Sequence, residues 1–131
     1  MMKKNTNEII RLLKSANYHL NNGDYGISCY ESRLSAIYSM EILANYLNIE
    51  INGSNLREIY KQINKIVNLS SIRYCIDYLD SLKNLEVNYC DTYCSDEIPG
   101  AEVLDYVNYD DSFRAYKCSN EIKDFVFRII S

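Results

Sequence analysis

Apolar residues recur every three or four positions along most of the chain, the spacing that gathers them on one face of an α-helix. The pattern breaks at turns such as Asn22-Gly23, where glycine suits the end of one helix and Asp24 the start of the next. One proline and four glycines leave few helix breakers, and no stretch alternates as a strand would. Five helices are predicted, over residues 5–21, 24–48, 55–68, 70–85 and 110–131. We therefore expect an all-α fold, a four- to five-helix up-and-down bundle in which residues 1–131 form a single domain.

The second predicted helix lies in the sequence NNGDYGISCYESRLSAIYSMEILANYL and is apolar or small on most of its circumference. Such a helix must be covered on several sides, so we expect it at the centre of the bundle. Its charged residues Glu31, Arg33 and Glu41 must reach water or find partners, because burying an unpaired charge is costly. With Tyr38, they are a candidate dimer interface in which Arg33 pairs with Glu31 or Glu41 across a two-fold axis. Ordinary surface positions are the alternative.

Acidic residues concentrate in one part of the chain. The net charge is −4, yet residues 77–111 hold ten acidic side chains and one lysine. Such an acidic belt repels phosphate backbones, so nucleic-acid binding across the whole surface is disfavoured. Residues 86–109 also lack helical periodicity and contain the only proline, Pro99. We expect a long functional loop there, with room for a short helical turn around residues 101–106.

A local basic face is predicted on the third helix. Arg57, Lys61 and Lys65 follow at four-residue intervals, which places them on one side of that helix, and Arg73 follows in the next. These four residues are the candidate contact for an anion, a nucleotide or nucleic acid. A solvated helix face is one alternative, and pairing with the acidic loop of the same or a neighbouring subunit is another.

No pattern typical of a metal, cofactor or catalytic centre occurs. The five cysteines are Cys29, Cys75, Cys90, Cys94 and Cys118. We expect most of them to be reduced and buried as small hydrophobes, with a Cys90–Cys94 or similar disulfide as the alternative. Zinc sites usually need four closely paired Cys or His ligands, and Cys90-x3-Cys94 with Cys75 or Cys118 matches poorly. The only histidine, His19, has no adjacent partner and is expected at a helix end, so we predict no catalytic residue, metal or cofactor.

The start of the chain, MMKKNTNEII, lacks the apolar core of a signal peptide. No apolar run approaches the roughly 20 residues that span a bilayer. We expect a cytoplasmic protein with no membrane association.

The order of elements resembles that of a HEPN domain, the higher-eukaryote-and-prokaryote nucleotide-binding helical bundle. The matching features are an amphipathic lead helix, the turn Asn22-Gly23-Asp24-Tyr25, a long helix with small residues at Ser28, Ser32 and Ala36, two shorter helices, a tyrosine-rich loop with proline, and a last helix beginning Asp110-Asp111-Ser112. The resemblance covers nearly the whole chain. It implies a homodimer in which the long helices pack together, and a class that includes ribonuclease toxins and partners of minimal nucleotidyltransferases.

Two departures from the family pattern shape the expected function. Active ribonucleases of the family carry an Arg-x4–6-His motif late in the domain, and no late arginine here is followed by a histidine. Many members also place Glu and Lys near the positions that hold Ile37 and Glu41. The resemblance therefore implies a non-catalytic dimer that binds a nucleotide or a partner protein, such as the nucleotidyltransferase of a toxin–antitoxin-type system.

Two other functions remain as alternatives. One is a HEPN-type ribonuclease with a non-standard active site that uses Arg114 or Arg73. The other is a tetratricopeptide-like adaptor, suggested by NNGDYGISCY, which would need repeats of about 34 residues. No such repeat is visible in the sequence.

Overall fold

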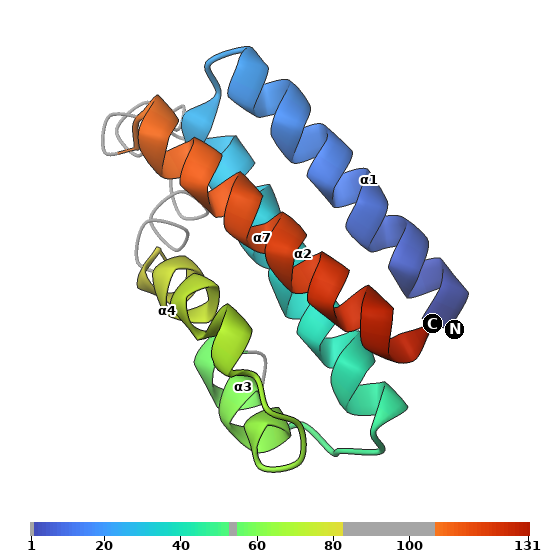
Figure 1. Ribbon diagram of the computed structural model, residues 1–131. Coiled ribbons are helices and arrows are strands. Elements are labelled where there is room, and N and C mark those ends of the chain that lie inside the picture. The colour runs from blue at the N-terminus through green and yellow to red at the C-terminus, as the bar shows by residue number, and fades with distance from the viewer. Residues whose placement is uncertain (1, 53–54, 83–106) are drawn as a thin grey trace.

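The computed structural model describes residues 2–52, 55–82 and 107–131 (Figure 1). Its elements are α1 (Met2–Asn21), α2 (Tyr25–Tyr46), α3 (Leu56–Asn64), the 3₁₀ turn η1 (Ser70–Ile72), α4 (Arg73–Ser81) and α7 (Tyr109–Ile130). No strand occurs in the described residues, so the predicted all-α bundle is confirmed. The end of the fourth predicted helix and most of the predicted acidic loop lie outside the described residues.

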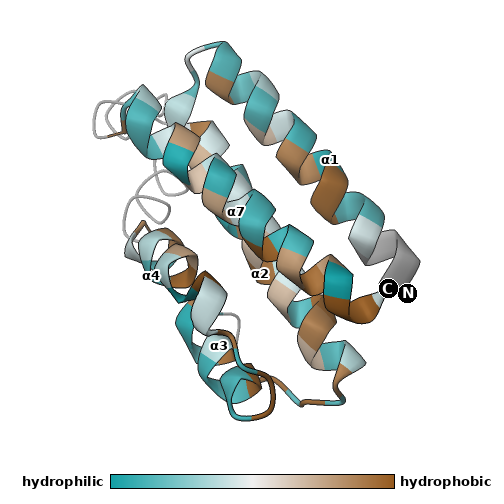
Figure 2. Ribbon diagram, in the orientation of Figure 1, coloured by the Kyte–Doolittle hydropathy of each residue, from teal (hydrophilic) through white to brown (hydrophobic). Residues whose placement is uncertain are grey.

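Three long helices form the body of the part of the chain that the structure describes. α2 packs along α1 on one side and along α7 on another, while α3 packs on α2 and α4 packs on α7. Figure 1 shows α1 running antiparallel to α2 and α7, with the two ends of the chain at the same end of the molecule. Hydrophobic and hydrophilic residues alternate in short bands along α1 and α7 in Figure 2, as expected for helices that bury one face.

The position of α2 at the centre of the bundle is confirmed, because apolar residues all along it are buried, including Ala36, Met40 and Leu43. Its serines let α1 approach closely. The Ser28 hydroxyl donates to the Ala16 carbonyl at 2.7 Å, and the Ser35 hydroxyl donates to the Ile9 carbonyl at 3.4 Å. These bonds satisfy hydroxyl groups that water does not reach.

The residues that flank the helices account for some of the helix ends. Gly23 adopts φ 82° in the turn before α2, as its predicted role requires. Asp24 is the N-cap residue of α2, as predicted, although its side chain makes no capping hydrogen bond. The last helix is capped by Asn108 rather than by the predicted cluster at residues 110–112. The Asn108 side chain accepts from the Asp111 backbone at 2.8 Å and the Asp111 carboxylate accepts from the Asn108 backbone at 3.3 Å.

None of the helices in the described part of the chain combines the length and apolar composition that crossing a membrane requires.

Candidate functional site

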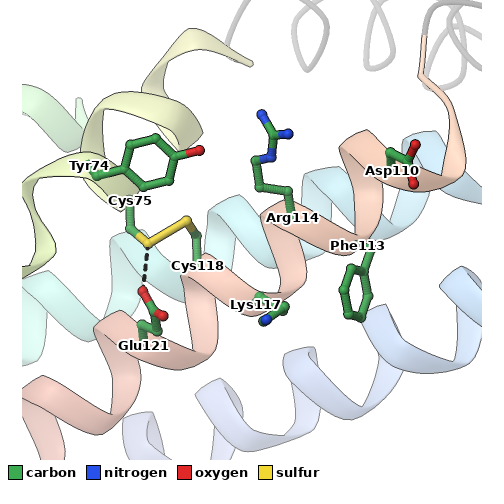
Figure 3. Close-up of a pocket in the computed structure, with 8 residues that line it drawn as sticks. All are labelled: Tyr74, Cys75, Asp110, Phe113, Arg114, Lys117, Cys118 and Glu121. Atoms are coloured by element: carbon green, nitrogen blue, oxygen red, sulfur yellow. Dashed lines mark hydrogen bonds between the residues drawn. A yellow bond between two sulfur atoms is a disulfide. The ribbon is translucent and has the colours of Figure 1, made fainter.

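A pocket of about 420 Å³ lies between α4 and α7. Tyr74 and Cys75 contribute from α4, and the remaining lining residues come from α7 (Figure 3): Asp110, Phe113, Arg114, Lys117, Cys118 and Glu121. Most of the α7 residues are spaced by three or four positions, so one side of that helix forms the wall. The volume falls in the range of small-molecule sites.

Two cations of the pocket lie over aromatic rings. The Arg114 guanidinium is 5.2 Å from the centre of the Tyr78 ring, and the Lys117 ammonium is 5.5 Å from that of Phe113. Neither forms an ion pair with any residue that the structure describes. Both are exposed, so their positive charges are available to an anionic ligand.

Exposed aromatic rings continue this surface on both sides of the cations. Tyr74 stacks on Tyr78 with ring centres 6.5 Å apart, and Tyr109 stacks on Phe113 at 5.8 Å. Tyr74 is 64% exposed and Phe113 is 40% exposed, so each can offer a ring face to a ligand. Nucleobases stack on such faces with little regard to their identity.

Tyr78 contacts two residues of this surface, since its ring faces the Arg114 guanidinium and stacks on Tyr74. Its hydroxyl donates to the Asp111 carbonyl at 2.9 Å, which links α4 to the first turn of α7. Burial, with the nearby Asp111 charge, raises the pKa of Tyr78 to about 12. The phenol is therefore protonated at neutral pH and does not serve as a general base.

The inner wall of the pocket contains sulfur. Cys75 and Cys118 form a disulfide between α4 and α7, so the prediction of reduced cysteines is wrong for these two. It holds for Cys29, a free and buried thiol whose pKa burial raises to about 12. Cys90 and Cys94 lie outside the described residues. The spacing of the cysteines gave no sign of this pairing, because it depends on how α4 and α7 face each other.

The two arginines of the predicted basic face, Arg57 and Arg73, lie close together because both contact the carboxylate of Asp77. Arg57 lies 3.3 Å from Asp77 and 3.3 Å from Asp80, and Arg73 lies 3.7 Å from Asp77. Their charge is therefore largely balanced by α4, within the same chain. The partner acids belong to α4, whereas the alternative raised from the sequence was pairing with the acidic loop.

The two lysines of the predicted basic face lie apart from that pair of arginines. Lys61 is 3.6 Å from Glu58, and both lysines line a shallow hollow of about 550 Å³ with Glu58, Gln62 and Ile49. The four predicted anion-contact residues thus belong to two neighbouring surfaces. Neither surface includes the pocket between α4 and α7.

The predicted interface residues point in different directions from α2. Arg33 is buried and faces α4, with Nη2 4.0 Å from Asp80 Oδ1. Glu31 faces α1, where Ser15 and His19 contact its carboxylate. Tyr38 and Glu41 are partly exposed near each other, and burial raises the pKa of both, with the Glu8 and Glu41 charges adding to the shift at Tyr38.

The single histidine takes part in a contact that the sequence did not suggest. His19 Nδ1 lies 2.8 Å from Glu31 Oε1, and the Ser15 hydroxyl donates to Glu31 Oε2 at 2.6 Å. Ser15 and Glu31 both approach the same ring nitrogen, whereas a catalytic triad needs them on opposite nitrogens. The cluster therefore ties α1 to α2 and does not form a nucleophilic centre.

Comparison with known proteins supports the fold. No protein-family model matches the chain, and no curated protein sequence matches it. Among solved structures, the chain is similar to the crystal structure of ST0689, an archaeal HEPN homologue, with a TM-score of 0.76 and 21% sequence identity. The match covers 100% of this chain and 98% of that protein. The chain therefore has the fold of HEPN domains, as its order of elements predicted.

Proposed function

We propose that this HEPN-like protein binds a nucleotide, free or as part of single-stranded RNA, in the pocket between α4 and α7. The observation that carries the proposal is the pair Arg114 and Lys117, exposed cations without an ion-pair partner among the described residues, flanked by exposed rings. We further propose that the protein acts by binding and is not a catalyst.

A nucleotide presents two chemical groups that this surface suits. Its phosphate would be held by the Arg114 guanidinium, whose planar fork matches two phosphate oxygens, and by the Lys117 ammonium. Its base would stack on Tyr74 or Phe113. Because rings and cations lie beside each other, one ligand can contact both kinds of group at once.

The arginines at Asp77 provide a matched control. Arg57 and Arg73 equal the pocket pair in number of charges, but a phosphate would have to displace carboxylates at 3.3 Å and 3.7 Å to reach them. If only the number of charges mattered, neutralising either pair would weaken nucleotide binding equally. The geometry predicts instead that only neutralising Arg114 and Lys117 weakens binding.

Fluorescence polarisation with a labelled short single-stranded RNA, competed by unlabelled mononucleotide, tests the proposal. The variant Arg114→Gln/Lys117→Gln should weaken binding by roughly tenfold or more, since each charged hydrogen bond contributes about 1.5–3 kcal/mol. Arg57→Gln/Arg73→Gln should change it by less than about threefold. Equal losses in the two variants, or no loss in the first, would overturn the proposal.

The same RNA on a denaturing gel tests the alternative of a ribonuclease. The observation that favours it is that Arg114, on the last helix, lines the pocket. We expect no cleavage by the wild type. Cleavage that is abolished by Arg114→Gln would replace the binding function with a catalytic one.

We also propose that the protein is a homodimer and that its partner is a minimal nucleotidyltransferase of a toxin–antitoxin-type pair. The HEPN fold supports this, and Tyr38 and Glu41 remain partly exposed on α2. Light scattering after size-exclusion chromatography should give twice the 15.3 kDa mass of the chain, and Glu41→Arg should lower it towards one chain while Glu50→Arg does not. A monomer at micromolar concentration would contradict the dimer.

A further inference from the structure

The inner wall of the pocket brings together three groups that bind metal ions. The sulfur atoms of Cys75 and Cys118 and a carboxylate oxygen of Glu121 all lie within 4.8 Å of one another. Figure 3 shows Glu121 reaching from α7 towards the sulfur pair, which itself joins α7 to α4. The distance from Glu121 Oε2 to Cys75 Sγ is 3.0 Å.

That carboxylate contact has no role in the disulfide form. A disulfide sulfur has no proton to donate, so the Glu121 oxygen meets only its lone pairs. In the reduced form the contact becomes favourable in two ways. The Cys75 thiol can donate to the carboxylate, or a cation can lie between the two thiolates and the carboxylate. A cation would stabilise the two buried thiolates, because a thiolate away from water needs an adjacent positive charge.

We propose that the reduced protein binds a zinc ion through Cys75, Cys118 and Glu121, with the fourth position open to the pocket. Two thiolates select a thiophilic ion, and one carboxylate oxygen completes a three-ligand set of the kind that leaves tetrahedral zinc a free position. The Cα atoms of the two cysteines are 5.0 Å apart. Small side-chain rotations from that separation bring the sulfurs to the roughly 3.8 Å that two Zn–S bonds of about 2.3 Å require.

The disulfide form and the zinc-bound form exclude each other, and they interconvert by thiol–disulfide exchange followed by metal binding. A dithiol reductant breaks the Cys75–Cys118 bond, gives two thiols and becomes a disulfide itself. Zinc then displaces the two thiol protons, which pass to solvent. Because the same sulfurs serve both states, the oxidised protein has no zinc site here.

The charge around the site suits this occupancy. Zinc with two thiolates and one carboxylate carries one net negative charge, and Arg114 and Lys117 line the same pocket. The open position faces that pocket, so it would accept water or a phosphate oxygen of the ligand. The phosphate contact rests on the proposed function, whereas zinc binding itself does not.

Titration of the reduced protein with Co²⁺ as a spectroscopic probe, followed by displacement with Zn²⁺, tests the proposal. For this titration the protein is prepared with the substitutions Cys90→Ser and Cys94→Ser, so that those two thiols cannot bind the metal. A phosphine is used as the reductant, because it does not compete for the metal. We expect one ion per chain, a thiolate-to-cobalt charge-transfer band and the intense visible bands of tetrahedral cobalt. Oxidised protein should bind none.

Variants assign the ligands. Cys75→Ser and Cys118→Ser should each abolish the charge-transfer band or weaken binding by at least about tenfold, and Glu121→Gln should weaken it about tenfold while keeping the band. Cys29→Ser is the matched control and should change nothing, since its buried thiol lies outside the cluster. Circular dichroism confirms that each variant is folded. No saturable binding, or binding that survives Cys118→Ser unchanged, would overturn the proposal.

The experiments distinguish a failure of the zinc proposal from a failure of the proposed nucleotide binding. Metal titration is read without nucleotide, and Arg114→Gln/Lys117→Gln should keep the cobalt spectrum even though it loses RNA binding. Loss of the spectrum in that variant would count against a site formed by Cys75, Cys118 and Glu121 alone.

Discussion

Replacing Asp80 with asparagine should destabilise the protein by about 3 kcal/mol. The Asp80 side chain is only 5% exposed and lies between two arginines, 4.0 Å from Arg33 and 3.3 Å from Arg57. Arg33 is itself 9% exposed, so Asp80→Asn removes a negative charge that faces a buried guanidinium. Breaking a buried pair by removing one partner typically costs about 3–5 kcal/mol. We take the lower end because the Arg33 contact is long and Arg57 is half exposed.

Asp77 on the same helix is the control. It contacts Arg57 at 3.3 Å and Arg73 at 3.7 Å, but its side chain is 43% exposed. Exposed pairs contribute about 0–1 kcal/mol, so Asp77→Asn should be nearly neutral. The two variants remove the same charge from the same helix and differ mainly in burial.

Urea unfolding followed by circular dichroism measures both. With a slope of about 2 kcal/mol per molar, Asp80→Asn should lower the midpoint by roughly 1.5 M and Asp77→Asn by less than about 0.5 M. The double variant Arg33→Met/Asp80→Leu should be more stable than Asp80→Asn, because apolar groups need no partner. Equal midpoints for the two asparagine variants would refute the argument from burial.

Three further predictions concern the core and the buried titratable groups. Ile122 is fully buried, so Ile122→Ala should cost about 2–5 kcal/mol in a thermal melt, and a loss below 1 kcal/mol would contradict its place in the core. Tyr78→Phe removes the bond to Asp111 and should cost about 0.5–1.5 kcal/mol. Because the pKa of Tyr78 rises from 10.0 to about 12 in the folded state, its contribution should be complete below pH 10 and lost as pH rises to about 12, so wild type and Tyr78→Phe should converge in stability there. Cys29, whose pKa rises to about 12 through burial, should stay unlabelled by iodoacetamide at pH 8 in native protein and react in urea, as mass spectrometry of peptides would show.

The helices could be predicted because their apolar spacing is a local property of the sequence. Their ends were harder to place, because several residues near each end can cap. Asn108 and Asp110 are both good capping residues, and only the structure shows that Asn108 makes the bond. The predicted third helix stops at Asn64, whose side chain accepts from the Leu69 backbone at 3.0 Å and turns the chain.

The pocket could not be predicted because its walls meet only in three dimensions. Tyr74 and Cys75 face Arg114 because α4 packs on α7, and no periodicity reports which sides of two helices meet. The sequence did contain one clue to the weakness of the predicted basic face, since Asp77 follows Arg73 by one helical turn. The proximity of Arg57 to the same acid was not visible.

The link between Cys75 and Cys118 makes the chain a closed ring with two tails. The two sulfurs are 43 residues apart in sequence, and a bond that closes a loop of this length restricts the unfolded chain by about 4 kcal/mol in the entropy model. All of residues 83–106 lie within the ring. A protease that cuts there would open the ring and leave one covalent molecule, which would run as a single band without reductant and as two bands with it. A partner that binds residues 83–106 would therefore bind a segment that is joined covalently to both α4 and α7, the helices that form the two walls of the pocket.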